Sequence, residues 1–382
     1  ASVAQGEFNG VELRFMGLNN QNLHNFVFRA LLKSWEEYTG AKITWIDLSQ
    51  ADYNGRLQQS IASGTVDFDV IEMGAPYEGD VLGKGLASAM PDWVKPIIDI
   101  EDLVNYLKPP VGTWNGTQYR TTIDGDCHNF NYRTDYFADQ DLASAWTSEG
   151  GEGAWAPPTT WQQVQAQTKF LKGKKIDGQD AYGFLDVAKP WGGFGWYFFA
   201  DRASAYVKHP DDHAWLFDID TMKPRINNPG FVRAIQDVVD LLPFEPPDQI
   251  NADGNTTGFN EFLGGTGAMC TWWGDIGSNV YTNDSSVVQD KVSFSVLPGS
   301  PDVYNSKTGQ WDTLSSGPNV APNEAYLGWG IYVMSTVDQN PVMQKAAWSI
   351  AAHLGAPDIS TWMVCYPTGF QPYRNAHFNV QD

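Results

Sequence analysis

Cationic side chains are scarce in this sequence. Lys and Arg together number 24 against 45 Asp and Glu, so the formal net charge at pH 7 is -21. Nucleic acids and anionic membrane surfaces bind proteins through cationic patches. The charge balance therefore argues against either of them as a partner, and it favours a soluble protein.

Cysteine is also sparse, at three residues: Cys127, Cys270 and Cys365. None lies in a CxxC pair, which argues against a zinc site or a thioredoxin-like site. The spacing leaves open one disulfide with one remaining thiol, or three buried thiols that act as small hydrophobic side chains.

Long apolar runs are missing, because no stretch approaches the roughly 18 residues that a membrane span requires. The sequence begins "ASVAQGEFNG", which has neither the charged nor the apolar region of a signal peptide. We therefore expect a signal peptide to be absent or already removed, as in a processed exported protein or a trimmed chain.

Familiar catalytic motifs are absent as well: the sequence contains no GxSxG, HExxH, GxxxxGK[ST] or GxGxxG. His209 and His213 are four residues apart, but Pro210 lies between them, which argues against a metal-binding helix. The 45 acidic residues make any pair of carboxylates uninformative as a glycosidase signal. We therefore predict no enzyme, cofactor or metal. A secreted glycan-active enzyme, either a glycoside hydrolase or a lyase using cleft carboxylates, remains the alternative, and a regulatory binding module is a third possibility.

Residues 11–74 alternate between strand and helix patterns. A strand pattern begins at residue 11, a helix stripe runs from Leu23 to a terminating Gly40, and a second strand and helix lead to Gly64. A short apolar strand follows at 68–74. This order predicts a doubly wound α/β lobe, whose ligands bind beyond the carboxyl ends of the strands.

The rest of the chain continues this mixture without a low-complexity linker. We expect helices after Thr159 or Thr160, from Pro229, and from Pro341 to Gly355, and strands within 258–275, 291–300 and 328–336. A length of 382 residues suggests two domains, and we expect ordered strands to join them.

Aromatic residues are abundant, with 16 Trp, and several lie beside glycines in expected loops. The stretch "KPWGGFGWYFF" (189–199) is the densest. We expect Trp191 to be presented to a ligand, whereas Phe194 and Phe198 enter a helix and pack in the core. Aromatic faces stack on sugar rings, and carboxylates and amides bond to hydroxyl groups. We therefore predict a sugar or polyol site formed by Asn19, Asn20, Glu72, Asp126, Trp191, Trp272, Trp273, Asp275, Trp329 and Arg374.

The order of these segments resembles the family 1 extracellular solute-binding proteins of ABC importers, the maltose-binding-protein-like group of sugar and polyol binders. The similarity rests on "FDVI" followed by a loop, "CHNFNYRTDYF", "PPTTW", "GGTGAMCTWWGD", "SFSVLP" and "GWGIYVMSTVDQNPVMQKAAWSIAAHL". It covers nearly the whole chain. Met73 stands where some members have a stacking aromatic residue, which leaves stacking in the first lobe open.

The resemblance implies two doubly wound α/β lobes of periplasmic-binding-protein type II topology with a ligand cleft between them. We expect lobe 1 at 1–123 and 291–336, and lobe 2 at 124–290 and 337–382. It also implies a monomer that captures a sugar or polyol and delivers it to ABC permease subunits. Such a protein is periplasmic, or extracellular and membrane-tethered.

Overall fold

The computed structural model describes residues 3–19, 23–176, 178–189, 194–212, 214–251, 258–323, 325–366 and 368–379. The chain forms two compact units. Unit 1 comprises Ala1–Cys127 and Glu324–Asp382, and unit 2 comprises His128–Asn323. The chain therefore passes between the units twice, directly after Cys127 and directly after Asn323.

This division corrects the expected lobe boundaries. Residues 291–323 belong to unit 2, because β12 (Val292–Ser295) pairs with β7 (His128–Arg133) in the sheet of that unit. Residues 337–382 belong to unit 1, where α12 (Pro341–Leu354) contributes the fully buried Trp348 to the core. Residues 124–127 also lie in unit 1.

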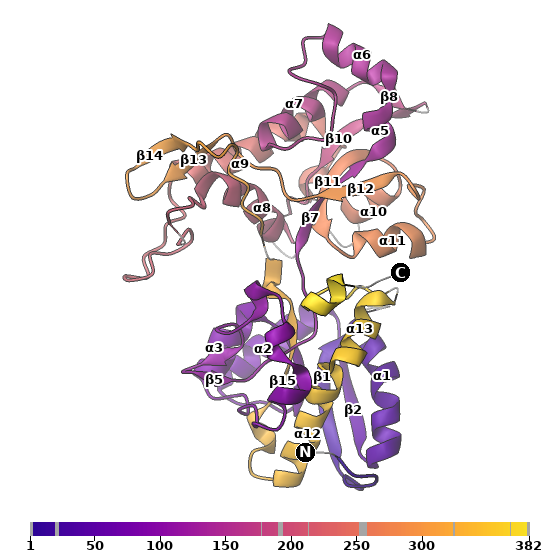
Figure 1. Cartoon of the computed structure of the whole chain (residues 1–382), viewed down its shortest axis with the longest axis vertical. Coiled ribbons are helices and arrows are strands. Elements are labelled where there is room, and N and C mark those ends of the chain that lie inside the picture. The colour runs from indigo at the N-terminus through magenta and orange to yellow at the C-terminus, as the bar shows by residue number, and fades with distance from the viewer. Residues whose placement is uncertain are drawn as a thin grey trace. The chain divides into compact units, whose positions relative to one another are not determined.

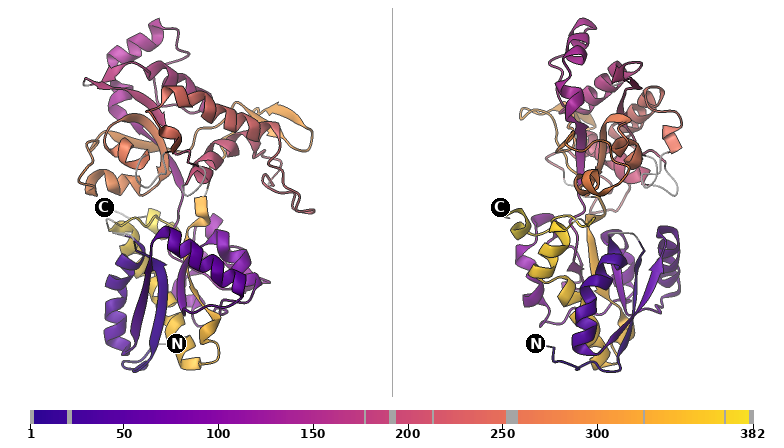
Figure 2. Two further views of the ribbon diagram at one scale, coloured as in Figure 1. Left: turned by 180° about the vertical axis from the view of Figure 1, so that it is seen from behind. Right: turned by 90° about the vertical axis from the view of Figure 1, so that its right-hand side faces the viewer.

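Unit 1 contains a five-stranded sheet in the order β2-β1-β3-β15-β6. Strands β1, β2 and β3 are parallel, and β15 runs antiparallel between β3 and β6. Every residue of β3 and β15 is buried, which requires cover on both faces of the sheet, and helices provide it (Figures 1 and 2). The elements of unit 1 include β1 (Glu12–Leu18), α1 (His24–Thr39), β2 (Lys42–Leu48), α2 (Gln50–Ser63), β3 (Val70–Gly74), α3 (Glu78–Gly83), α4 (Lys95–Ile98), β4 (Thr113–Trp114), β5 (Thr117–Gln118), β6 (Thr121–Thr122), β15 (Trp329–Val333), α12 and α13 (Pro357–Cys365).

The local signals in the first part of the chain are confirmed. Helices α1 and α2 end at Gly40 and Gly64, which take positive φ angles of 78° and 71°. Glycine adopts this left-handed conformation without the steric cost that a Cβ would impose. The strand–helix alternation expected over 11–74 is therefore present, and it places the carboxyl ends of β1, β2 and β3 at one edge.

Unit 2 contains a four-stranded sheet in the order β10-β11-β7-β12. Helix α7 begins with a capping box in which Thr160 and Gln163 exchange hydrogen bonds, as the sequence predicted. The elements of unit 2 include β7, α5 (Thr134–Ala138), α6 (Gln140–Ser148), α7 (Trp161–Leu171), β8 (Lys175–Ile176), β9 (Gln179–Asp180), β10 (Tyr182–Leu185), α8 (Gly195–Val207), α9 (Pro229–Leu241), α10 (Gly258–Leu263), β11 (Gly267–Trp273), α11 (Ile276–Thr282), β12, β13 (Asp302–Asn305) and β14 (Gln310–Thr313).

The cysteine alternatives are settled by position. Cys127, Cys270 and Cys365 form no disulfide, and only Cys270 is fully buried. The structure therefore supports neither the single disulfide nor three buried thiols. Within the described part of the chain, no helix is long and apolar enough to cross a membrane.

Candidate functional site

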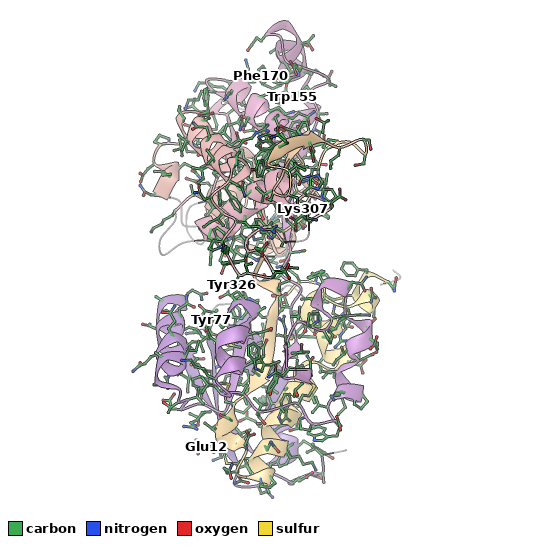
Figure 3. All side chains as sticks on the ribbon, turned by 90° about the vertical axis from the view of Figure 1, so that its left-hand side faces the viewer. Glu12, Tyr77, Trp155, Phe170, Lys307 and Tyr326 are labelled. Carbon is green, nitrogen blue, oxygen red and sulfur yellow. The ribbon has the colours of Figure 1, made fainter. Side chains whose placement is uncertain are left out.

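In unit 1, aromatic and polar side chains gather at the carboxyl edge of the parallel strands. Glu72 lies on β3, and Trp329 lies opposite Gly74 in the register of β15 with β3. His24 begins α1, which follows β1. Figure 3 shows Tyr77 and Tyr326 close together at this end, with Glu12 at the opposite end of the unit. This is the edge at which doubly wound sheets bind ligands.

A buried histidine–carboxylate contact anchors this edge. His24 Nδ1 lies 2.5 Å from Glu72 Oε1, and both side chains are almost fully buried. Glu72 Oε2 has no hydrogen-bond partner among the described residues. Tyr53 donates its hydroxyl to the Glu72 carbonyl at 2.6 Å, and its ring packs edge-on to Trp329. The carboxyl thus keeps one acceptor oxygen unused.

Tyr326 adds a second aromatic ring at this edge of unit 1. Its ring stacks on Trp329 at 4.9 Å and 24°. A Cβ at Gly74 would lie 1.9 Å from the Tyr326 ring, so this glycine is required for the close approach. Tyr326 and Leu327 both take positive φ angles, 67° and 50°. Such strain in non-glycine residues is concentrated at functional sites, which singles out this loop.

Unit 2 has a comparable group at one end of its sheet. His128 begins β7 and lies opposite Trp273 at the end of β11. The His128 Nδ1 atom is 2.7 Å from Asp201 Oδ2, and both side chains are fully buried. The imidazole stacks on Phe198 at 4.8 Å and meets Trp273 edge-on at 4.4 Å. Asn323 donates a further hydrogen bond to Asp201.

Two ring nitrogens in this group have no hydrogen-bond partner among the described residues: His128 Nε2 and Trp273 Nε1. Trp273 is half-buried, whereas Trp272 points into the core and stacks on Phe198 at 5.4 Å. Asp275 directly precedes α11, and its carboxylate accepts a hydrogen bond from the Asn279 side chain. The group therefore combines aromatic surface with hydrogen-bonding atoms, as the edge of unit 1 does.

The predicted residues fall into distinct settings. Glu72 and Trp329 come together in unit 1, and Trp273 and Asp275 are neighbours in unit 2. Asn19 directly follows β1 and is exposed, and its backbone N–H donates to the carbonyl oxygen of Leu48. Asn20 and Trp191 lie outside the described residues.

Two predicted residues are committed to internal contacts. Asp126 is buried and accepts a 3.5 Å hydrogen bond from Gln371. Arg374 is 1% exposed, and its guanidinium donates to Ser360 Oγ and to the carbonyls of Ile98, Asp99 and Gly355. This placement makes Arg374 a structural residue and corrects its assignment to the ligand site.

Sequence reasoning missed His24, His128, Asp201, Tyr77 and Tyr326. The two histidines lie 48 and 73 residues from their carboxylate partners, so no local spacing could have revealed the pairs. Tyr326 did carry a signal, because it is an aromatic residue two positions before Gly328 and three before the predicted Trp329.

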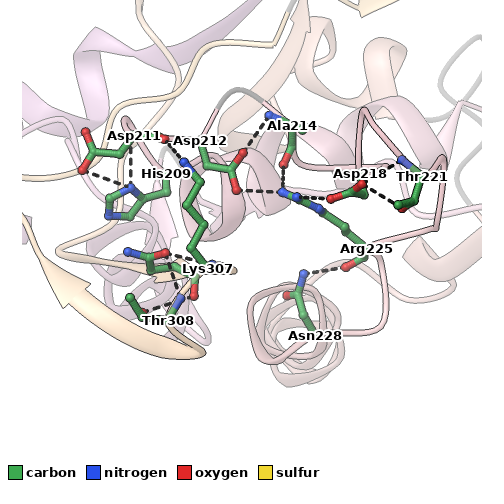
Figure 4. A network of polar contacts seen from close by, with 11 residues as sticks. His209, Asp211, Asp212, Ala214, Asp218, Thr221, Arg225, Asn228, Lys307 and Thr308 are labelled. Atoms are coloured by element: carbon green, nitrogen blue, oxygen red, sulfur yellow. Dashed lines mark hydrogen bonds and ion pairs between the residues drawn. The ribbon is translucent and has the colours of Figure 1, made fainter.

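A hydrogen-bond network around Arg225 and a cavity in unit 2 involve none of the residues of these two groups. In Figure 4, Arg225 donates hydrogen bonds to Asp212, Asp218 and the Ala214 carbonyl and so fastens a surface hairpin. The guanidinium holds the pKa of Asp218 well below its usual range. A cavity of about 310 Å³ in unit 2 is lined by Pro243, Glu245 and their neighbours, and by none of the predicted ligand residues. Among the described residues, no cluster of His, Cys, Asp and Glu is arranged to hold a metal ion.

Comparison with known proteins finds a family whose sequence model matches most of this chain. The sequence model of the family described as bacterial extracellular solute-binding protein matches residues 30–375. No curated protein matches the chain.

Solved structures share the fold at low sequence identity. A solute-binding protein of Agrobacterium radiobacter K84 in complex with ribitol is 20% identical, with a TM-score of 0.70 over 97% of this chain and 82% of that one. A protein of Agrobacterium vitis S4 with bound D-mannitol is 18% identical, with a TM-score of 0.68 over 98% and 80%. Maltose-bound MalE3 of T. maritima is 17% identical, with a TM-score of 0.70 over 97% and 83%.

Proposed function

This chain belongs to the bacterial extracellular solute-binding proteins, and we propose that it captures a sugar or polyol and delivers it to the permease of an ABC importer. A solute-binding protein is a carrier and not an enzyme, so the glycan-active enzyme is no longer favoured. The structural neighbours that carry ribitol, D-mannitol and maltose support this class of ligand.

One observation carries the ligand class: each unit combines aromatic rings with hydrogen-bonding atoms that no described residue satisfies. Glu72 Oε2 lies near the Trp329 and Tyr326 stack, and Trp273 offers both a ring and an unpaired N–H. A polar group buried without a partner costs about 1–3 kcal/mol. Hydroxyl groups of a ligand would remove that cost, while the rings would cover its C–H faces.

We assign ligand contact in unit 1 to Glu72, Tyr326 and Trp329, with Tyr326 as the more exposed ring. In unit 2 we assign it to Trp273 and Asp275. Trp272 supports Trp273 from the core. Asn19, Asn20 and Trp191 stay predictions, with Trp191 as a further stacking ring.

The family name places the protein outside the cytoplasm. We propose that it is periplasmic or tethered to the outer face of the membrane, and that it works as a monomer beside its permease. Size-exclusion chromatography with light scattering tests the monomer, and an apparent mass near twice 42.4 kDa would contradict it.

A thermal-shift screen tests the function directly. Ribitol, D-mannitol, maltose and a wider panel of sugars and polyols are compared with amino acids and sugar phosphates. A ligand stabilises the fold by RT ln(1 + [L]/Kd), which is about 2.7 kcal/mol at a hundredfold excess over Kd. We expect stabilisation by at least one neutral sugar or polyol, confirmed by calorimetry. Stabilisation by amino acids alone would refute the proposed ligand class.

A further inference from the structure

The chain leaves unit 1 through residues 124–127, which we call the exit segment. Gln371 contacts all four residues of this segment. Its N–H donates to Asp124 Oδ1 at 2.7 Å, its carbonyl accepts from Gly125 N at 3.2 Å, and its side-chain oxygen accepts from Cys127 N at 3.2 Å. Its amide nitrogen also lies 3.5 Å from Asp126 Oδ1. One residue thus secures every position of the segment.

The segment fits closely against its support. A Cβ at Gly125 would lie 2.2 Å from the Pro372 carbonyl oxygen, and Asp126 takes a φ of 49°. Tyr106 donates its hydroxyl to the Gly125 carbonyl at 2.9 Å. A displacement of the segment must therefore break the contacts with Gln371.

Asp124 is the titratable group at the centre of this support, and it is 3% exposed. The charged and titratable groups that act on it are His24 from α1, Glu72 from β3 and Tyr373 from the loop after Gln371. Burial raises the pKa of Asp124 to about 7, and the charge of Glu72 adds to the increase. The N–H of Gln371, the charge of His24 and the N–H of Gly125 oppose it.

We propose that proton binding at Asp124 controls how firmly unit 1 holds the exit segment. The protonated carboxyl is neutral, so it stays buried at little electrostatic cost and still accepts from Gln371 through its carbonyl oxygen. The ionised carboxyl gains free energy when the support opens and water reaches it. The segment is therefore held tightly at acidic pH and loosens as the pH rises toward 7.

The direction of the pH effect follows from the difference between the pKa values of Asp124 in the open and the closed support. In the opened support Asp124 is hydrated and has an ordinary pKa near 4, well below its value in the closed support. The closed state then loses relative stability as the pH rises from about 4 to about 7, by up to a factor of ten per pH unit, because over this range Asp124 is ionised in the open state and protonated in the closed state. The pH window of the device therefore extends from about 4 to 7, and above it opening is at its easiest.

Hydrogen exchange of the ligand-free full chain tests the proposal without any knowledge of the ligand. Exchange of the Gly125 and Cys127 amides is measured from pH 4.5 to 8.5 and divided by the intrinsic exchange rate at each pH. We expect the opening equilibrium constant to rise by up to tenfold per pH unit between about pH 5 and 7 and then to level off. A constant that does not change over this range would overturn the proposal.

Variants assign the effect to Asp124. Asp124→Asn keeps an acceptor oxygen but cannot ionise, so the constant should become independent of pH. Glu245→Gln, which removes a buried carboxyl of unit 2, is the matched control and should leave the exit-segment profile unchanged. A pH dependence that persists in Asp124→Asn would refute the role of this carboxyl.

Gln371→Met covers the case in which Asp124→Asn does not fold. It removes the side-chain acceptor of Cys127 but keeps the backbone N–H that bonds to Asp124. We expect faster exchange of Cys127 at every pH and an unchanged pH dependence at Gly125. If Gly125 exchange lost its pH dependence in this variant, the Gln371 side chain rather than Asp124 would control opening of the exit segment, which would contradict the proposal.

Discussion

Glu245→Gln should stabilise the protein at neutral pH. Glu245 is 2% exposed and lies in unit 2 near Asp186, Arg202 and Glu261. Burial, assisted by the charge of Asp186, raises the pKa of its carboxyl to about 9, although Arg202 opposes the shift. In the unfolded chain the same group has a pKa of about 4.3. At pH 7 folding must therefore take up a proton.

The size of the effect follows from these values. Because the folded pKa is the higher one, the contribution of Glu245 to stability is complete below about pH 4 and is lost progressively as the pH rises toward 9. Between the unfolded pKa and pH 7 lie about 2.7 pH units, each equivalent to 1.36 kcal/mol, so about 3–4 kcal/mol is lost. Glutamine has the same shape and does not titrate. The free energy of unfolding of Glu245→Gln should therefore exceed that of the parent chain, and the difference should grow by about 1.4 kcal/mol for each unit that the pH rises.

Urea unfolding followed by circular dichroism at pH 5, 6, 7 and 8 measures this difference. Glu152→Gln is the matched control, because Glu152 is exposed in the same unit and should show no trend with pH. A free-energy difference between Glu245→Gln and the parent chain that stays constant from pH 5 to 8 would refute the reasoning.

The remaining predictions concern the ligand. Tyr326→Ala should weaken binding about 5- to 150-fold in calorimetry, since stacking on an aromatic ring contributes about 1–3 kcal/mol; unchanged affinity would remove Tyr326 from the site. Trp191→Ala should also weaken binding more than folding, whereas a loss of about 3–5 kcal/mol of stability would make Trp191 a core residue. Ligand incubated with the protein for a day should be recovered intact, and turnover would contradict a carrier. Saturating ligand should lower the radius of gyration in small-angle scattering, because the family resemblance implies lobe closure; an unchanged profile would count against it.

Elements governed by local signals could be predicted from the sequence. The terminating glycines of α1 and α2 and the capping box of α7 act within a few residues of the feature that they determine. The placement of Glu72 on the third strand followed from the strand–helix alternation. The lobe boundaries did not follow, because the pairing of β12 with β7 joins segments about 160 residues apart.

The candidate site was predictable only in part. Trp272 and Trp273 were both assigned to the ligand, although successive side chains of a strand point to opposite faces. That alternation sends Trp272 into the core and leaves Trp273 half-buried. Arg374 was misassigned because no sequence pattern shows that the carbonyls of Ile98, Asp99 and Gly355 converge on it.

The two passages of the chain between the units also set an order of synthesis. All of unit 2, His128–Asn323, emerges from the ribosome as one continuous segment and can fold as soon as it is complete. Unit 1 must wait, because β15 lies between β3 and β6 in its sheet and comes from Glu324–Asp382, which follow unit 2 in the chain. Until those residues appear, β3 and β6 have no strand to join them. The segment before unit 2 therefore cannot complete the sheet of unit 1 until Glu324–Asp382 has also been synthesised.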